Sequence, residues 1–281
     1  MVETLAVTKD KKNRAFLKWA GGKFNLIEDI NAKLPEAKKL IEPFVGAASV
    51  FLNTDYPKYL LNDINADLIN LYNIVKHQST DYITDSAKLF TSVYNEEQRY
   101  YQMRQKFNDS EDIYERAVYF LYLNRHGYNG LCRYNKSGKF NVPFGRYKAP
   151  YFPEKELLYF AEKSQLATFT CESFEKVFAR ARQGSVIYCD PPYAPISKTA
   201  MFNSYAAGGF TLDNQKKLAS LAQRTGYKRN IPVLVSNHDT EFTRSIYQGA
   251  DITELQVSRF ISQNGNTRVK VAELLALFQD S

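Results

Sequence analysis

The sequence has 281 residues, which is enough for one large α/β domain with or without a smaller insert. Apolar residues make up 44% and charged residues 24%, a composition that excludes a disordered or fibrous chain. The formal net charge of +7 favours a polyanionic partner, with nucleic acid as the first candidate, although charge alone is equally compatible with a basic protein that has no such partner.

Cysteine and histidine usage excludes further classes. The cysteines, Cys132, Cys171 and Cys189, form no CxxC pair, and the histidines are scattered, so the sequence predicts neither a disulfide framework nor a zinc site. The N-terminal stretch lacks an apolar signal core, and no apolar run approaches the ~18 residues of a membrane span. We therefore expect a soluble, cytoplasmic protein without a metal ion.

Short apolar runs alternate with amphipathic stretches, which is typical of an α/β sheet. In chain order the patterns predict strands at 39–44 and 59–63, a helix at 66–77, successive helices from 81 to 123, a strand at 168–171, a helix at 174–181, a strand at 185–190, a helix at 212–224, and strands at 233–237 and 252–257. The last apolar run, 271–278, is too short for its periodicity to separate a strand from a helix.

Residues 124–153 differ from the rest of the chain. They are rich in Gly, Asn, aromatic and cationic residues, and Lys136-Ser137-Gly138 gives a hairpin-like turn signal. We predict a helical insert that ends in a β-ribbon, at about 66–153. This insert would interrupt a main domain made of residues 13–65 and 154–281, after a flexible N-terminus at 1–12.

The tetrapeptide Asp190-Pro191-Pro192-Tyr193 follows directly on the apolar run 185–189. At average residue usage this tetrapeptide arises by chance about once in a thousand chains of this length. Its position after a predicted strand also favours a functional site, because ligands of open α/β sheets bind at the carboxyl ends of strands. A plain proline turn is the alternative. If the Asp190 carboxylate and the Pro191 carbonyl each accept one hydrogen of an amino group such as that of adenine, its nitrogen lone pair is freed to attack an electrophile. Tyr193 could stack on the base.

A second motif, IEPFVGAAS at 41–49, reads as a strand, a turn of small residues and a helix start. Such turns allow the backbone to approach a cofactor closely, although tight packing alone would also explain this one. Asp63 lies seventeen residues after Gly46 at the end of the next strand, where an acidic residue binds ribose hydroxyls in dinucleotide folds. Both GxGxxG and GxxxxGK[ST] are absent, which weakens the case for NAD and for ATP.

Two basic segments complete the set of motifs. FLKWAGGK at 16–23 places the only tryptophan, two glycines and two cations ahead of a helix, which alone is compatible with an ordinary loop and helix cap. Residues 124–148 contain six Lys or Arg, five Tyr or Phe and no Asp or Glu. Interleaved cations and aromatics suit phosphate binding, base reading and stacking, whereas a solvated basic loop is the simpler alternative.

Taken in this order, the four segments resemble the DNA adenine methyltransferase (Dam) family, which methylates adenine in 5′-GATC-3′. The similarity covers nearly the whole chain from about residue 13 and includes FLKWAGGK, EPFVGA, NDIN, RHGYNGLCRYN, FNVPFGRYK, SVIYCDPPYAP and VSNHDT. DPPY marks amino-methyltransferases generally, whereas the long middle match is specific to Dam-like enzymes. The order of cofactor turn, recognition insert and DPPY is that of their α group.

The resemblance implies a fold, a cofactor and a reaction. The expected fold is a Rossmann-like, mostly parallel, seven-stranded methyltransferase sheet with an inserted helical and β-hairpin domain that recognises double-stranded DNA. S-adenosylmethionine would be the cofactor and S-adenosylhomocysteine the product, without a metal. The adenine would be flipped out of the duplex, because its amino group cannot otherwise reach the cofactor, and would then take the methyl group directly in line. We expect a monomer of bacterial or phage origin.

The resemblance also assigns roles to residues. Asp190, Pro191 and Tyr193 match the family's catalytic motif. The positions that match its cofactor-binding residues are Trp19, Lys23, Phe44, Gly46, Asp63 and Asp190.

For DNA, the resemblance implies that Lys18 contacts the first base pair, that Arg133 reads guanine and that Leu131 and Pro143 contact the thymine methyl. Tyr128 and Asn129 match the pair that enters the duplex when adenine is flipped. The residues expected to support these or to contact phosphates are Arg125, Arg146 and Tyr147.

One position departs from the family pattern, because many relatives have a second glycine, as in FxGxG, where this chain has Ala48. The added methyl is expected to widen the approach of the cofactor slightly without abolishing activity. Three alternatives remain: the methylase of a restriction–modification system, an amino-methyltransferase that acts on RNA, and a DNA-binding protein without activity. The intact DPPY motif, Asp63 and Lys23 disfavour the last.

Overall fold

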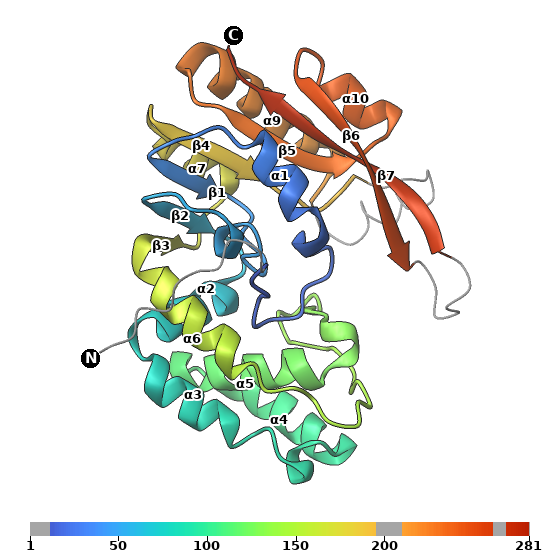
Figure 1. The fold of residues 1–281 in the computed structure, drawn as a ribbon. Coiled ribbons are helices and arrows are strands. Elements are labelled where there is room, and N and C mark those ends of the chain that lie inside the picture. Colours follow the sequence, from blue (N-terminus) through green and yellow to red (C-terminus); the bar gives the residue numbers. More distant parts are fainter. Residues whose placement is uncertain (1–11, 195–209, 261–267, 281) are drawn as a thin grey trace. The chain divides into compact units, whose positions relative to one another are not determined.

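The structure, a computed structural model, describes residues 12–194, 210–260 and 268–280 (Figure 1). Almost all of the predicted flexible N-terminus, residues 1–11, lies outside the described part. The chain divides into two compact units. The helical unit comprises Met1–Glu28, Gly46–Asp55 and Asn70–Gln165, and the sheet unit comprises Asp29–Val45, Tyr56–Ile69 and Leu166–Ser281.

The sheet unit is built on a seven-stranded sheet with the order β3-β2-β1-β4-β5-β7-β6. Its strands are β1 (Lys39–Glu42), β2 (Tyr59–Asn62), β3 (Ala167–Thr170), β4 (Ser185–Cys189), β5 (Val233–His238), β6 (Asp251–Phe260) and β7 (Arg268–Phe278). The five neighbouring strands β3, β2, β1, β4 and β5 are parallel to one another, whereas β7 is antiparallel to both β5 and β6. The predicted mostly parallel, seven-stranded sheet is confirmed, and the ambiguous run 271–278 belongs to a strand.

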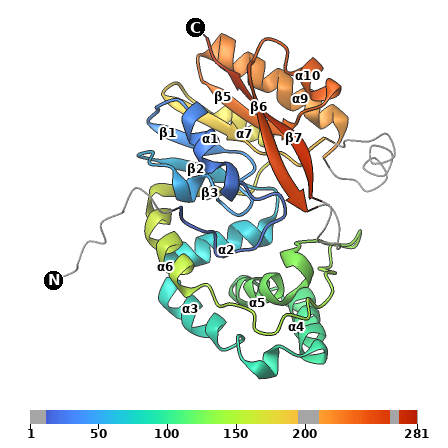
Figure 2. The same cartoon turned by 45° about the vertical axis from the view of Figure 1, so that its right-hand side comes forward.

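Buried apolar runs explain why these segments are strands. Every residue of β2 and of β4 is buried, as expected for parallel strands whose two faces are both covered. Helices α7 (Phe174–Arg180) and α9 (Leu212–Gln223) pack against this core, where Val177, Ile187 and Leu218 are fully buried. These two helices were predicted within one residue of their ends. Helix α9 is followed by a π-helical turn, η6 (Arg224–Lys228). Helix α10 (Glu241–Ile246) lies beside α9 (Figure 2).

Two helices belong partly to each unit. Helix α1 (Ile27–Lys33) follows the short turn η1 (Phe24–Leu26), and α2 (Ala66–His77) follows β2 with the predicted bounds.

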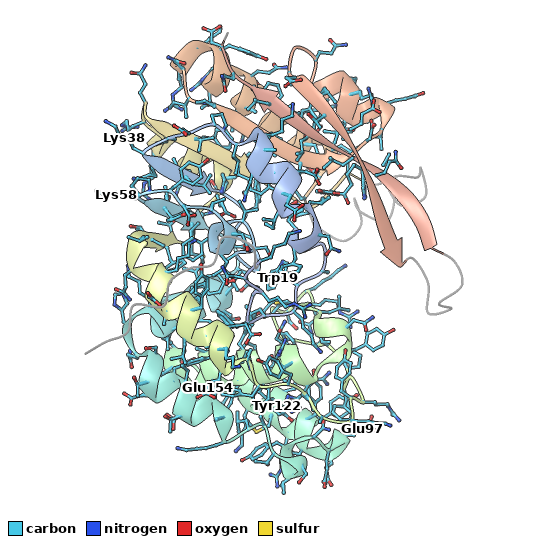
Figure 3. The ribbon with its side chains drawn as sticks, viewed as in Figure 1. Trp19, Lys38, Lys58, Glu97, Tyr122 and Glu154 are labelled. Carbon is cyan, nitrogen blue, oxygen red and sulfur yellow. The ribbon has the colours of Figure 1, made fainter. Side chains whose placement is uncertain are left out.

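The described part of the helical unit contains helices and turns but no named strand. Its elements are η2 (Phe51–Asn53), α3 (Ser79–Ala87), η3 (Ser92–Tyr94), α4 (Glu97–Asp109), α5 (Ile113–His126), η4 (Tyr128–Gly130), α6 (Glu154–Lys163) and η5 (Ser164–Leu166), the last extending one residue into the sheet unit. Figure 3 labels Glu97 at the start of α4, Tyr122 on α5 and Glu154 at the start of α6. The predicted series of helices from 81 to 123 is confirmed.

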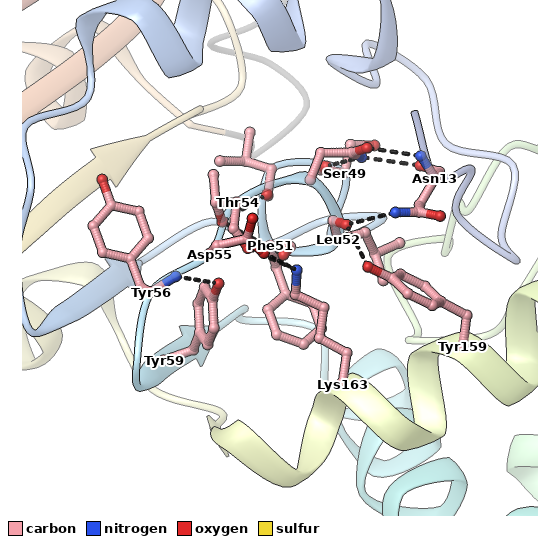
Figure 4. A network of polar contacts seen from close by, with 12 residues as sticks. Asn13, Ser49, Phe51, Leu52, Thr54, Asp55, Tyr56, Tyr59, Tyr159 and Lys163 are labelled. Atoms are coloured by element: carbon pink, nitrogen blue, oxygen red, sulfur yellow. Dashed lines mark hydrogen bonds and ion pairs between the residues drawn. The ribbon is translucent and has the colours of Figure 1, made fainter. Parts of the chain in front are cut away.

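Aromatic side chains form the core of this unit. Tyr72 and Phe160 stack 4.7 Å apart, and Phe16 meets both rings edge-on. Polar contacts attach the N-terminal segment and the loop 49–55 to this core (Figure 4): the Asn13 amide donates to Asn53 Oδ1 at 2.7 Å, and Lys163 Nζ donates to the Thr54 carbonyl at 2.6 Å. Residues 12–28 and 46–55 therefore belong to the same unit as the helices of the middle of the chain.

The predicted β-ribbon is a hairpin with very little ladder. Its turn is closed by the amide of Asn135, which donates to the Lys139 carbonyl at 2.9 Å, but only two isolated bridges, Gly127 to Phe144 and Tyr134 to Phe140, join its arms. The turn η4 interrupts one arm between these two bridges, which shortens the ladder. The outer edge of the other arm is paired with helix α4 instead of a strand. The Asn108 amide bonds both backbone groups of Phe140, at 2.8 and 3.1 Å.

None of the helices in the described ranges is long and apolar enough to cross a bilayer.

Candidate functional site

The carboxyl ends of β1, β2 and β4 place three predicted site residues along one edge of the sheet. Ile41 of β1 pairs with Ile187 of β4 at the centre of the parallel strands. From β1 the chain continues to β2 and β3 on one side, and from β4 it continues to β5 on the other side, so the direction of strand addition reverses between β1 and β4. Phe44, Asp63 and Asp190 follow the ends of these strands. This is the switch point at which open α/β sheets bind ligands.

Asp190 is half-buried directly after β4, and a neighbouring strand fixes its carboxylate. Ser236 of β5 donates from Oγ to Asp190 Oδ1 at 3.1 Å, and the Tyr188 hydroxyl lies 3.1 Å from the same Oγ. The hydrogen bond from Ser236 therefore fixes the direction of the Asp190 carboxylate. Sequence reasoning did not single out Ser236, although it begins the polar end of an apolar strand in the VSNHDT segment.

Buried amide side chains hold the backbone of the DPPY loop. Gln215 of α9 donates to the Pro192 carbonyl at 2.7 Å, and Asn237 of β5 accepts from the Ala194 amide at 3.1 Å. The two side chains bond each other at 3.0 Å, so they act as one support. Pro191 is buried in this loop. Because the loop is anchored at the Pro192 carbonyl and at the Ala194 amide, the backbone that follows the prolines keeps a fixed direction.

Tyr193 is held in one orientation by a buried carboxylate. Its hydroxyl donates to Glu273 Oε2 at 2.8 Å, and its ring meets His238 edge-on with centroids 4.7 Å apart. Glu273 lies on β7 and is 1% exposed. Burial and, next, the charge of Asp190 raise the pKa of Tyr193 well above its usual value, so the phenol stays neutral. The sequence did not indicate Glu273 as a site residue, because its periodicity could not assign residues 271–278 to a strand or to a helix.

Asp63 stands at the end of β2 in a tightly bonded turn. Its Oδ1 accepts the Asn65 amide at 3.0 Å. The preceding Asn62 is 1% exposed and donates to the carbonyls of Pro43 and Glu172, both at 3.0 Å. This side chain ties together the loops that follow β1, β2 and β3. The Asp63 carboxylate is thereby fixed relative to the loop that carries Phe44.

The other predicted cofactor residues, Trp19, Lys23 and Gly46, belong to the helical unit. Gly46 has φ +46°, and a Cβ there would lie 3.0 Å from Trp19 Nε1, so the indole packs directly on this glycine. Lys23 is 4% exposed, and its Nζ donates to the Gly21 carbonyl at 2.9 Å. The chain passes from the sheet unit to the helical unit between Val45 and Gly46, within the predicted cofactor turn.

Ala48, the departure from the family pattern, has φ +63° and is fully buried. This left-handed conformation costs a residue with a Cβ about 1–2 kcal/mol, which explains the glycine of FxGxG at this position. The alanine keeps the glycine-type backbone, so the substitution strains the turn without reshaping it.

The structure brings together five of the predicted DNA-binding residues in the helical unit. The Tyr128 amide donates to the Pro143 carbonyl at 2.8 Å, and the Asn129 amide donates to the Tyr147 hydroxyl at 2.9 Å. Lys18 Nζ lies 3.9 Å from the centre of the Tyr147 ring, a close cation–π contact. Asn129 is exposed at φ +52°, at the top of a tight turn.

The other predicted DNA-binding residues have different surroundings. Arg133 is exposed, and its Nε donates to Asn141 Oδ1 at 2.8 Å, while Leu131 is half-buried nearby in sequence. Arg146 is exposed and pairs with Glu97 at 3.1 Å. Arg125 is 8% exposed and donates to the Tyr151 carbonyl at 3.0 Å, a placement that suits support more than direct contact with a phosphate.

Within the described residues, no group of three or more His, Cys, Asp or Glu side chains could hold a metal ion.

The sheet order, with the DPPY loop at its switch point, defines a Rossmann-like methyltransferase fold. Residues 19–261 match the D12 class N6 adenine-specific DNA methyltransferases, and the chain belongs to this family. Membership of a methyltransferase family implies the use of S-adenosylmethionine.

The relatives called DNA adenine methylase include the following three proteins. The protein of Vibrio cholerae serotype O1 is 59% identical over 268 residues, which cover 95% of this chain and 97% of its own. The protein of Escherichia coli K12 is 59% identical over 269 residues, 96% of each chain. The protein of Serratia marcescens is 56% identical over 269 residues, 96% of this chain and 100% of its own.

Proposed function

We infer that this protein transfers a methyl group from S-adenosylmethionine to the N6 amino group of adenine in double-stranded DNA, at 5′-GATC-3′. The observation that carries this conclusion is the DPPY loop, anchored at the switch point of the sheet in a member of an adenine-specific family. The 56–59% identity to three DNA adenine methylases, over nearly the whole of each chain, supports the same activity on the same kind of substrate.

The residues present fit the cofactor. Asp63 offers a fixed carboxylate for ribose hydroxyls, Gly46 lets the Trp19 indole pack directly on the backbone of the cofactor turn, and Phe44 adds an aromatic face beside Phe174 and Phe210. Together with Trp19, Lys23 and Asp190, these residues would hold S-adenosylmethionine. The cofactor supplies a methyl group on a positively charged sulfur, and its product is S-adenosylhomocysteine.

The residues of the DPPY loop prepare the adenine. The Asp190 carboxylate accepts one amino hydrogen and the Pro191 carbonyl accepts the other, which frees the nitrogen lone pair. Ser236 keeps the aspartate from rotating, because it donates to Asp190 Oδ1 at 3.1 Å. Tyr193 stacks on the base as a neutral ring, and Glu273 fixes its direction at 2.8 Å.

The helical unit is proposed to read the site, with the recognition insert at about 66–153 as its main part. Tyr128, which is half-buried, and Asn129, which is exposed, lie in a tight turn and enter the duplex when the adenine is flipped out, which partly offsets the cost of unstacking. Lys18 contacts the first base pair, and Arg133 reads guanine with its planar fork. Leu131 and Pro143 contact the thymine methyl, while Arg125, Arg146 and Tyr147 support these contacts or meet phosphates.

GATC is palindromic, so one monomer can treat both strands in turn. We propose a monomeric enzyme of a bacterial or phage-encoded system that acts in the cytoplasm.

The test is methyl transfer from tritium-labelled S-adenosylmethionine to duplex DNA and to RNA. Asp190→Ala should lower transfer to DNA by several orders of magnitude, because the amino group loses an acceptor and its alignment, while DNA binding survives. Asp280→Ala, which changes an exposed aspartate after β7, is the matched control and should leave transfer intact. Near-normal turnover of Asp190→Ala, or a preference of the wild type for RNA, would contradict the proposal.

A further inference from the structure

One buried amide side chain, Asn124, holds two segments that are far apart in sequence. It lies in the last turn of α5 and is 2% exposed. Its Oδ1 accepts the Lys18 amide at 2.8 Å, and its Nδ2 donates to the Lys18 carbonyl at 2.7 Å and to the Gly130 carbonyl at 3.1 Å. Both backbone groups of Lys18 are thus paired with one side chain, which also holds the turn after Tyr128.

The two segments are in direct contact beside Asn124. Gly130 has φ +62°, and a Cβ built there would lie 2.2 Å from Lys18 Cβ, so Lys18 rests on the backbone of the turn. The Lys18 ammonium lies over the Tyr147 ring at 3.9 Å, and the Tyr147 hydroxyl accepts the Asn129 amide at 2.9 Å. Lys18, the turn and Tyr147 therefore form a closed set of contacts around one amide.

We propose that Asn124 is a positioning residue that fixes Lys18 and the Tyr128–Gly130 turn relative to each other, so that recognition of the first base pair and entry into the duplex are coupled. This inference rests on the proposed function, in which Lys18 contacts that base pair and Tyr128 enters the duplex. Asn124 itself is buried and does not touch DNA. It acts by satisfying three backbone groups that would otherwise lose their partner in a water-poor site.

Asn124→Asp is the sharpest perturbation, because it preserves the shape of the side chain while it removes both N–H donors; it also adds a negative charge, which the control variant adds as well. A carboxylate still accepts the Lys18 amide, but it cannot donate to the carbonyls of Lys18 and Gly130. Asn108→Asp is the matched control. Asn108 also bonds both backbone groups of one residue, Phe140, at 2.8 and 3.1 Å in the same unit.

Hydrogen exchange of the free protein tests the coupling without DNA. In Asn124→Asp, exchange in peptides 16–22 and 127–131 should rise together, by about tenfold, since both lose a bonded partner. Asn108→Asp should raise exchange around Phe140 and leave both of those peptides unchanged. A rise in only one of the two peptides, or in neither, would overturn the proposal.

Methylation kinetics test the consequence. Asn124→Asp should lower the kcat/KM ratio of GATC over a duplex with a changed first base pair by about tenfold, and should lower the fluorescence rise of 2-aminopurine at the target position. Lys18→Ala in the same background should add little to the loss of discrimination.

Two results would decide against Asn124 in different ways. An equal slowing of Asn124→Asp on all duplexes, with discrimination and the 2-aminopurine signal unchanged, would show a merely structural role. A wild-type protein that transfers no methyl to DNA would refute the proposed function, and this role with it.

Discussion

His126 makes the stability of the helical unit dependent on pH. It is fully buried at the end of α5, with its ring 4.1 Å from that of Tyr122 and 5.0 Å from that of Phe90. Nδ1 lies 3.0 Å from the Tyr122 carbonyl, and Nε2 has no hydrogen-bond partner among the described residues. Burial lowers the pKa of His126 from 6.5 to about 4, with smaller contributions in the same direction from Lys18 and Arg125.

The sign and size of the effect follow from this shift. The unfolded chain takes up a proton as the pH falls below about 6.5, whereas the folded protein takes it up only near pH 4. Stability is therefore full above pH 6.5 and is lost progressively as the pH falls toward 4. A difference of two to three units between the pKa of His126 in the unfolded chain and in the folded protein corresponds to about 3 kcal/mol in the free energy of unfolding. This is a large part of the stability of an ordinary domain.

The assay compares the free energy of unfolding in urea at pH 7 and at pH 4.5 for the wild type and His126→Phe. The phenylalanine keeps an aromatic ring in the stack and removes the titrating group. Between pH 7 and pH 4.5, we expect the free energy of unfolding to fall by about 2–3 kcal/mol more in the wild type than in His126→Phe. The exposed His77, changed to Gln, is the control and should follow the wild type. An identical loss in the wild type and in His126→Phe would refute the reasoning.

Three further predictions concern the site. Tyr128→Ala should lower turnover on a fully paired duplex more than on one whose target adenine is mispaired, and an equal loss on both would place Tyr128 elsewhere in the mechanism. Lys139→Ala combined with Lys148→Ala should flatten the slope of log affinity against log salt by about two without changing the preferred sequence, and an unchanged slope would remove the hairpin from the phosphate-binding surface. Tyr193→Phe and Glu273→Leu should each lower kcat by roughly tenfold, and the double variant should be no slower than either, because each substitution removes the same hydrogen bond; fully additive losses would contradict this.

The parallel part of the sheet could be predicted from the sequence because its strands are buried on both faces. A continuous apolar run such as 185–189 can be identified as a buried strand without knowledge of the strands beside it. The polar residue that follows the run marks the carboxyl end of the strand, where the site lies. Helices α2, α7 and α9 were predictable for a similar reason, since their apolar faces repeat over two or more turns.

The remaining features depend on contacts between distant segments. Periodicity could not assign the run 271–278, which is a strand only because β5 and β6 lie on both sides of it. The hairpin has only two isolated bridges because the turn η4 interrupts one of its arms. The side chains that position the site, such as Ser236 and Asn124, are ordinary polar residues whose partners lie 46 and 106 positions away. Single-sequence patterns carry no signal for such pairs.

The central claim is methylation of adenine in GATC, and mapping of the methylated bases in a plasmid tests it most directly. The plasmid would be propagated with this protein in cells that lack other DNA methylases and sequenced for modified bases. The wild type should place N6-methyladenine at GATC almost alone. Arg133→Ala should spread it to sites that differ at one outer base pair, because a bidentate contact to guanine contributes ~1–3 kcal/mol of discrimination. Methylation of cytosine, of adenine without a sequence preference, or of no base at all would contradict the account.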